Sequence, residues 1–228
     1  MTESSPAPVT RANPPLLAIF GGTFDPVHFG HLRAAVEARE SLQLDRLILL
    51  PAGNPPHRSG TFAGAGHRLA MLQLAVKNYP DLPVDPREVQ RQGYSWMVDT
   101  LAEFRAESGP NQPLALLLGQ DAVNQLDSWK EWRRLFELAH IVIMRRPDSS
   151  HAYSAGLLAE IEPRLVGKLA ALRHQPGGLV LPLEVTQLAI SSTDIRQRLQ
   201  SGQSCRFLLP AEVIGYIRQH GLYNEGEP

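Results

Sequence analysis

The sequence predicts an α/β fold, a doubly wound, Rossmann-like parallel sheet in a single domain. Short continuous runs of Leu, Ile and Val are typical of parallel strands that are buried on both faces. Amphipathic segments separate these runs, and such strand–helix alternation favours right-handed βαβ crossovers. Ligands of doubly wound sheets bind at the carboxyl ends of the strands. The residues that follow each predicted strand are therefore the candidate site.

The expected elements follow from these runs and from the apolar faces between them. We expect strands at 16–20, 46–50, 82–89, 114–118, 141–144 and 179–185. We expect helices with one apolar face at 32–42, 69–76, 98–104 and 157–172. Pro163 lies inside the last of these segments and is expected to kink it, because proline removes a backbone donor.

Composition limits the class of protein. With 228 residues, 43% of them hydrophobic, the chain can bury a sizeable core, and its length favours one domain with insertions. A net charge of −1 argues against an electrostatically driven nucleic-acid binder. The single cysteine, Cys205, excludes an intrachain disulfide framework and a cysteine-based zinc site.

The N-terminal segment and the lengths of the apolar runs predict the organisation and location of the protein. Residues 1–15 are polar and lack the apolar stretch of a secretory signal, so we expect a flexible tail before a domain at 16–224. No apolar run reaches the ~20 residues that cross a bilayer. We therefore expect a cytoplasmic protein with no membrane or nucleic-acid partner.

The first strand ends in a segment that suits an anion. Gly21 and Gly22 let backbone N–H groups approach a ligand closely, and Gly30 opens a helix whose N-terminus favours negative charge. His28 and His31 are three residues apart, so one helical turn presents both imidazoles to one site. A tight turn with a surface histidine pair is the plainer alternative. A metal site is not expected, because no third ligand stands at helical spacing.

This segment, GGTFDPVHFGHL, resembles the (T/S)-F-D-P-x-H-x-G-H signature of the nucleotidyltransferase α/β-phosphodiesterase superfamily. The resemblance implies that His28 and His31 contact the phosphates of a nucleoside triphosphate and stabilise the transition state of adenylyl transfer. It also implies that ATP is bound by Gly21, Gly22, Thr23 and Phe24.

A second signature follows the last predicted strand. In ISSTDIR, Ser191 or Ser192 can cap a helix, and a well-capped amphipathic helix is a sufficient explanation by itself. The string also resembles the superfamily's I-S-S-T-x-I-R element, which implies ATP contacts for Ile190, Ser191, Ser192 and Arg196. Arginine offers a planar fork for phosphate oxygens, so Arg196 is the expected leaving-group donor.

Two further segments concern the acceptor and the ribose. PAGNPPHR at 51–58 resembles the P-P-H-(K/R) element of nicotinate (nicotinamide) mononucleotide adenylyltransferases, which implies phosphate contacts for His57 and Arg58. A polyproline-like surface loop is the alternative. Gly119 and Asp121 resemble that family's G-x-D, whose acid accepts a hydrogen bond from a ribose hydroxyl; otherwise Asp121 is merely a helix cap.

The pyridine pocket is expected from three weaker similarities. The segment at 93–101 resembles (S/T)-Y-T-x-D-T-L, with Ser95 in place of Thr, and implies that Tyr94, Ser95 and Trp96 line the nicotinate pocket. A Trp pair resembles L-x-x-W-x-x-W, and its first member, Trp129, is assigned to stacking on the pyridine ring. Whether Trp132 stacks instead stays open.

The third similarity is Arg-Arg-Pro after the fifth predicted strand, which resembles the family's K-R-P. We expect Arg146 to serve the substrate phosphate or carboxylate and Arg145 to be solvated surface. The resemblance covers the chain from Leu16 to about Leu222 and fits poorly at 148–177.

Taken together, these similarities imply transfer of AMP from ATP to nicotinate mononucleotide, giving nicotinate adenine dinucleotide and pyrophosphate. The implied catalytic residues are His28, His31 and Arg196, and Mg²⁺ is expected to arrive bound to ATP. Rival readings are a phosphopantetheine adenylyltransferase, a class I aminoacyl-tRNA synthetase and a catalytically dead nucleotide sensor. The preference for nicotinate over nicotinamide and the oligomeric state stay open.

Overall fold

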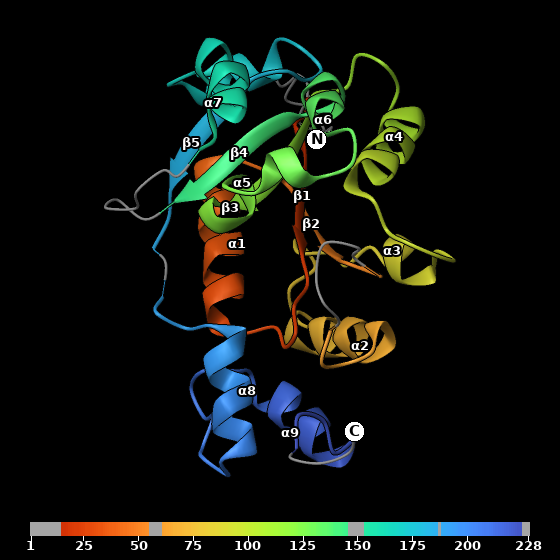
Figure 1. Cartoon of the computed structure of the whole chain (residues 1–228), viewed down its shortest axis with the longest axis vertical. Coiled ribbons are helices and arrows are strands. Elements are labelled where there is room, and N and C mark those ends of the chain that lie inside the picture. Colours follow the sequence, from red (N-terminus) through yellow and green to blue (C-terminus); the bar gives the residue numbers. More distant parts are fainter. Residues whose placement is uncertain (1–14, 55–60, 146–152, 187, 225–228) are drawn as a thin grey trace, which may run out of the picture.

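The computed structural model describes residues 15–54, 61–145, 153–186 and 188–224. Within these ranges it contains one five-stranded sheet, in which each neighbouring pair of strands is parallel, with the order β2-β1-β3-β4-β5 (Figure 1). The strands are β1 Leu17–Gly22, β2 Leu47–Pro51, β3 Leu114–Gly119, β4 His140–Arg145 and β5 Val180–Glu184.

The strand order makes the sheet doubly wound. β1 pairs with β2 on one side (Gly22 opposite Pro51) and with β3 on the other (Phe20 opposite Leu117). The chain therefore builds outward from β1 in one direction and then returns to build in the other. The carboxyl ends of β1 and β3 flank this reversal, which is where such sheets bind ligands. The predicted fold class is confirmed.

Helices cover both faces of the sheet and its carboxyl-end edge. They are α1 Phe29–Ser41, α2 Ala65–Ala75, α3 Arg87–Gln90, α4 Met97–Ser108, α5 Gln120–Val123, α6 Trp132–Leu138, α7 Ala155–Ile161, α8 Ser192–Gln200 and α9 Ala211–Gln219. Short 3₁₀ turns are η1 Leu126–Ser128, η2 Glu162–Arg164 and η3 Leu169–Arg173. Among the described residues, no helix is both long and apolar enough to cross a membrane.

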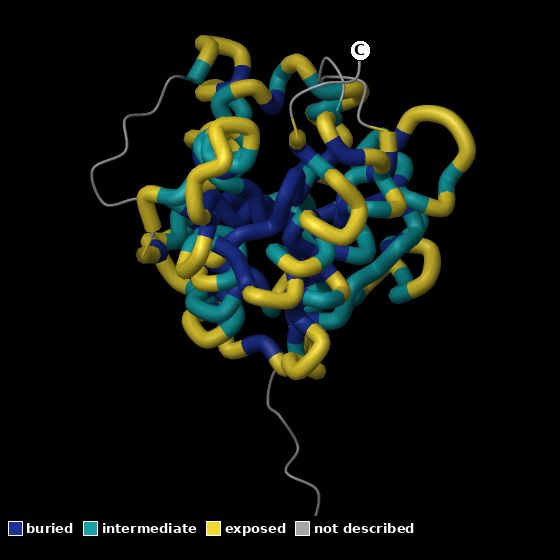
Figure 2. Tube along the Cα trace, turned by 90° about the horizontal axis from the view of Figure 1, so that it is seen from below, coloured by how far each residue is buried: buried dark blue, intermediate teal, exposed yellow. Residues whose placement is uncertain are grey.

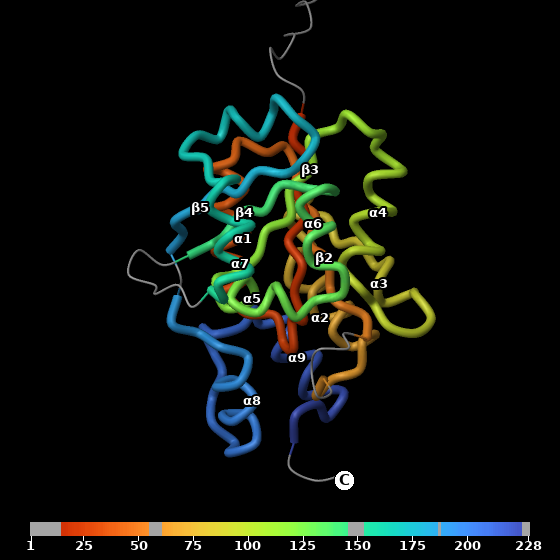
Figure 3. The backbone as a smooth tube through the Cα atoms, turned by 45° about the horizontal axis from the view of Figure 1, so that its top comes forward, coloured from red at the N-terminus to blue at the C-terminus, as the bar shows by residue number. Residues whose placement is uncertain are grey.

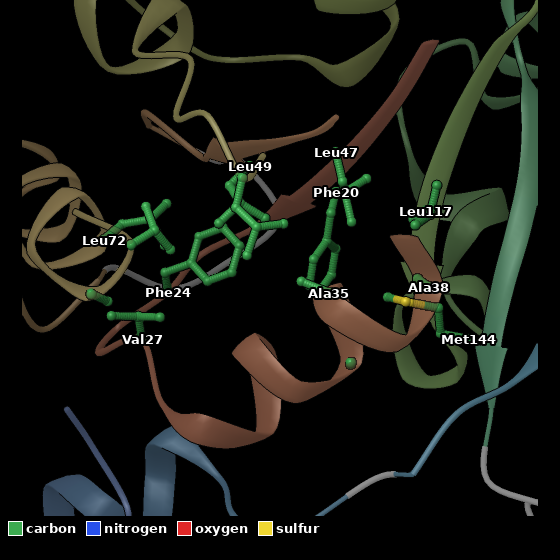
Figure 4. Packing of buried hydrophobic residues seen from close by; sticks show 14 of the residues in the cluster. Phe20, Phe24, Val27, Ala35, Ala38, Leu47, Leu49, Leu72, Leu117 and Met144 are labelled. Carbon is green, nitrogen blue, oxygen red and sulfur yellow. The ribbon is translucent and has the colours of Figure 1, made fainter. Parts of the chain in front are cut away.

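Alternate residues of each strand enter two separate cores. Phe20 and Leu117 pack with α1, α2, α8 and α9, whereas Ile19 and Leu116 pack with α4, α6 and α7. The small residues Ala35 and Ala38 allow α1 to lie close to the sheet (Figure 4). Viewed from the carboxyl-end side, the buried residues gather in the centre of the molecule, with exposed segments around them (Figure 2). Burial on both faces explains the continuous apolar runs of the strands.

The strand predicted at 82–89 is wrong. This segment forms a single bridge, Val84 opposite Leu49, and then turns into α3. Pro83 and Pro86 lack backbone N–H groups and cannot donate to a ladder, so pairing ends after one residue. Leu82 is buried all the same, which is why the segment reads as a strand.

The long helix predicted at 157–172 is also wrong, because Pro163 ends the helix rather than kinking it. α7 stops at Ile161, the η2 turn contains Pro163, and helical structure resumes only as the short η3. Proline removes the N–H that the helix needs and clashes with the preceding turn. The apolar spacing is still used, since Leu157, Ile161 and Leu172 are buried.

Candidate active site

The turn after β1 folds back over one of its own side chains. Phe24 has a left-handed backbone (φ 51°) and only 2% exposure, and Figure 4 shows it among Leu49, Leu72 and Val27. A Cβ on Gly22 would lie 2.9 Å from the Phe24 ring, so this position requires glycine. A left-handed residue costs about 1–2 kcal/mol, which burial of a phenyl ring offsets. The predicted glycine turn therefore has a well-defined shape.

The two histidines of the first signature cap α1 together. His28 is the N-cap residue, and its Nδ1 accepts a hydrogen bond from the backbone N–H of His31 at 3.3 Å. In return, Nδ1 of His31 accepts from the backbone N–H of His28 at 3.3 Å. The rings stack, with centroids 3.7 Å apart and planes 23° from parallel. Because each Nδ1 is an acceptor, each neutral ring carries its proton on Nε2.

Burial reinforces the neutral state of one ring. His28 is 5% exposed, and desolvation lowers its pKa from 6.5 to about 4. At neutral pH its Nε2–H is a neutral hydrogen-bond donor. A donor that is already oriented stabilises developing negative charge with little reorganisation during the reaction.

The second signature lies against the first. Ser191 caps α8 by accepting from the N–H of Asp194, and Ser192 Oγ donates to the carbonyl of Pro26 at 3.0 Å. Arg196 Nη1 donates to the carbonyl of Asp25 at 2.7 Å. α8 and α9 lie beyond the carboxyl ends of the strands (Figure 3). Segments from opposite ends of the chain thus share one edge of the sheet.

The start of α1 fits closely under this second segment. A Cβ on Gly30 would lie 2.9 Å from Nδ1 of His28 and 3.4 Å from the carbonyl oxygen of Ile190. Glycine is thus required where the helix that carries the histidines meets the loop that leads into α8.

A buried arginine, Arg68, holds together the loops at the carboxyl ends of β1 and β2. It is fully buried on α2 and donates to the carbonyls of Thr23 at 2.9 Å, Ala52 at 2.5 Å and Gly53 at 2.6 Å. Its Nε also donates to Ala63 at 3.2 Å. Arg68 thereby joins the turn after β1 to the loop after β2. Sequence reasoning missed it, although its signal was present: an arginine at helical spacing with the buried Leu72.

The loop after β2 packs on the segment predicted to line the nicotinate pocket. Ser95 is 6% exposed, its Oγ accepts from Asn54 N at 3.3 Å, and it donates to the carbonyl of Glu88 at 3.1 Å. A Cβ on Gly53 would lie 2.0 Å from that same carbonyl oxygen. The two segments therefore lie side by side, and the hydrogen bonds of Ser95 join them. Tyr94 is exposed.

Glu88 is a buried carboxyl beneath this contact. Thr100 donates to it at 2.7 Å, and the Gly53 N–H also bonds to it. Burial raises the pKa of Glu88, against the lowering effect of these hydrogen bonds and of the Arg91 charge. Glu88 was not among the predicted site residues. Its signal was a carboxylate inside a segment that was predicted to be a strand.

The remaining predicted residues lie on the β3 side. Gly119 ends β3 and is the N-cap residue of α5, whose first turn places Asp121 in solvent. Trp129 follows η1, is half-buried and packs against the second core. Trp132 begins α6 and packs edge-on against Phe136, with ring centroids 6.3 Å apart. The choice of stacking tryptophan stays a prediction.

Arg145, which was expected to be solvated surface, is only partly exposed. Its side chain is 29% exposed and lies 3.7 Å from Glu184 on the neighbouring strand. The cause is the parallel register, which sets the two residues opposite each other at the end of β4 and β5. The predicted roles of His57, Arg58 and Arg146 fall outside the described residues.

Comparison with known proteins decides the family. The family model for cytidylyltransferase-like proteins matches residues 19–198. A "Probable nicotinate-nucleotide adenylyltransferase" of Methylococcus capsulatus is 47% identical over 209 residues, which is 91% of this chain and 99% of the relative. The chain belongs to this cytidylyltransferase-like family. Within it, a relative from Marinobacter nauticus with the same name is 44% identical over 90% of this chain and 95% of its own.

Solved structures of other proteins share the fold. The Plasmodium falciparum nicotinic acid mononucleotide adenylyltransferase complexed with NaAD superposes with a TM-score of 0.67 at 17% identity. The match covers 92% of this chain and 97% of that chain. At this identity the likeness concerns the arrangement of the sheet and its helices.

Proposed function

We propose that this chain is a nicotinate-nucleotide adenylyltransferase. It transfers AMP from ATP to nicotinate mononucleotide and releases pyrophosphate, a step of NAD biosynthesis. Relatives of that name cover nine-tenths of the chain. The observation that carries the proposal is the bonding of Arg196 and Ser192 to the carbonyls of Asp25 and Pro26, next to the stacked histidines.

The acceptor supplies its own nucleophile. A phosphate monoester has a second pKa of about 6, so it is largely a dianion at neutral pH. Attack of one of its oxygens on the α-phosphorus, in line with the departing pyrophosphate, needs no general base and no enzyme nucleophile. The protein contributes position and stabilisation of the charge that develops.

His28 and His31 donate Nε2–H hydrogen bonds to the α- and β-phosphates. The reciprocal cap fixes both tautomers and the ring orientations before ATP binds, so little reorganisation is left for the transition state. Arg196 faces the pyrophosphate, whose charge grows as the bond breaks. Amides of the glycine turn and of the first turn of α8 complete the anion site.

Mg²⁺ binds with ATP, held by the phosphates. Among the described residues, no group of three or more His, Cys, Asp or Glu side chains could hold a metal ion. The nearby Asp25 carboxylate accepts from the backbone N–H groups of Phe62 and Ala63, so it is committed to the fold. This donor set suits an ion that stays on the nucleotide with several of its waters. When bound, the ion neutralises phosphate charge.

The acceptor lies between the loop after β2 and the start of α4. Backbone amides near Ser95 and Trp96 read the nicotinate carboxylate, and Trp129 stacks on the pyridine ring. The Ser95 N–H itself is not one of them, because it donates to the carbonyl of Asn54 at 3.0 Å. Asp121 receives the ribose hydroxyl. His57 and Arg58 serve the acceptor phosphate, and Arg146 serves its phosphate or its carboxylate.

A pyrophosphate-release assay with ATP and a panel of acceptors tests the proposal. Nicotinate mononucleotide, nicotinamide mononucleotide and phosphopantetheine are compared at equal concentration. We expect the highest kcat/KM with nicotinate mononucleotide. Faster turnover of phosphopantetheine would move the chain to the rival enzyme, and ATP binding without turnover of any acceptor would make it a sensor.

A further inference from the structure

Asp25 uses its side chain and its main chain for different elements. The buried carboxylate accepts from Phe62 N at 2.8 Å, from Ala63 N at 3.1 Å and from the Tyr223 hydroxyl at 2.6 Å. Its main-chain carbonyl accepts from Arg196 at 2.7 Å. One residue thus links the segment that precedes α2, the C-terminal segment and the leaving-group arginine.

Asp25, Arg196 and Phe62 form a closed set of mutual contacts. The Arg196 guanidinium carbon lies 4.1 Å from the centroid of the Phe62 ring, while the Phe62 N–H bonds back to Asp25. Phe62 is 67% exposed, so burial does not explain an aromatic residue at this position. Its ring face serves the guanidinium, in the geometry of a cation–π contact. A shift of Asp25 therefore moves Phe62 and Arg196 together.

The chain turns sharply to bring the Tyr223 hydroxyl to the Asp25 carboxylate. Gly221 and Tyr223 both have left-handed backbones, with φ of 60° and 63°, after the end of α9. Tyr223 is 8% exposed, and burial together with the Asp25 carboxylate raises its pKa, so its hydroxyl stays a donor. A non-glycine residue keeps such a conformation only where its surroundings hold it.

We propose that Tyr223 is a positioning residue for adenylyl transfer: through Asp25 it holds Arg196 and Phe62 on the leaving-group side of the site. This role rests on the proposed function and adds a residue beyond both signatures. Arg196 then depends on a hydroxyl almost thirty residues further along the chain. Loss of that hydroxyl impairs the transition state more than substrate binding.

Tyr223→Phe tests this role, because it removes only the hydroxyl. Tyr216→Phe is the matched control: it removes a hydroxyl on α9 that bonds to His67 at 3.0 Å and does not contact Asp25. In pyrophosphate-release assays we expect Tyr223→Phe to lower kcat about tenfold, with both KM values within about twofold. The control stays within about twofold in kcat.

The decisive measurement repeats both changes in an Arg196→Gln background. If Tyr223 acts through Arg196, Tyr223→Phe lowers kcat there by less than about twofold, because coupled residues are not additive. A residue that only stabilises the fold would cost the same factor in both backgrounds, and that result overturns the proposal. An unchanged kcat for Tyr223→Phe in the wild-type background overturns it as well.

Phe62→Leu is a second variant for the case in which Tyr223→Phe does not fold, as judged by circular dichroism. Its exposed ring is not needed for the core, so kcat is expected to fall about fivefold in the wild-type background and to stay nearly constant with Arg196→Gln. Equal losses in the two backgrounds refute the role. Wild-type protein that does not adenylylate nicotinate mononucleotide overturns the proposed function and this role together.

Discussion

The pH dependence of stability is the first prediction: the wild type and His28→Asn should differ in how much unfolding free energy they lose on acidification. Asparagine is a favoured N-cap residue, so it can still accept from the backbone at the start of α1, but it does not titrate. In the wild type, protonation of Nδ1 would remove the acceptor that bonds to His31 N. The folded protein resists that protonation, because burial lowers the pKa of His28 from 6.5 to about 4.

The sign follows from proton counting. Above pH 6.5 the ring is neutral in both states and contributes no pH dependence. Between pH 6.5 and about 4 the unfolded chain binds a proton that the folded chain does not, so the free energy of unfolding falls as the pH falls. One pKa unit corresponds to about 1.4 kcal/mol, so His28 alone should cost about 2 kcal/mol between pH 7 and pH 5.

Urea denaturation of the wild type and of His28→Asn at pH 7 and pH 5 measures this cost. Other groups titrate in both proteins, so the relevant quantity is the difference between the two losses of unfolding free energy. We expect the wild type to lose about 2 kcal/mol more than the variant. Equal losses would mean that His28 is not held neutral, and the tautomer argument for the Nε2–H donor would fail with it.

Other consequences can be measured with the same preparations. His31→Ala should lower kcat about 10²–10³-fold in the pyrophosphate assay with the circular dichroism spectrum unchanged, and near wild-type turnover would contradict its phosphate role. Trp129→Ala should raise the KM for nicotinate mononucleotide about tenfold and leave that for ATP unchanged, whereas a rise for ATP alone would reverse the assignment. Gly53→Ala should lower the free energy of unfolding by about 1–3 kcal/mol, because its Cβ meets the Glu88 carbonyl at 2.0 Å. Gly66→Ala, whose Cβ meets nothing within 4 Å, should not destabilise the protein, and equal effects of the two glycine changes would refute the packing argument.

Features that are local in sequence were predictable. The buried runs became β1, β3 and β4, and β1 extends the expected strand only to Gly22. The spacing of three predicted that His28 and His31 lie together, although not that they cap α1, and a motif of a few residues predicted the cap by Ser191 or Ser192. In each of these caps the interacting groups lie within one helical turn, so the local sequence pattern identifies the residues that are in contact.

The remaining features depend on distance along the chain. Asp25 and Tyr223 are 198 residues apart, and neither has a local pattern that names the other. The segment around Val84 contained enough apolar residues for a strand, but its pairing depended on N–H groups that the prolines lack. Apolar spacing predicts burial at such positions and leaves the hydrogen-bond partners undetermined.

Much of this edge is joined through main-chain carbonyls. Arg68 bonds to those of Thr23, Ala52 and Gly53, while Arg196 bonds to that of Asp25. Every residue type supplies a carbonyl, so the sequence reveals these donors and hides their acceptors. This asymmetry explains why Arg196 could be singled out from its motif while its partner could not. It also means that side-chain changes at Ala52 can leave the Arg68 network intact, whereas loss of the guanidinium would leave four carbonyls, in three segments, without their shared donor.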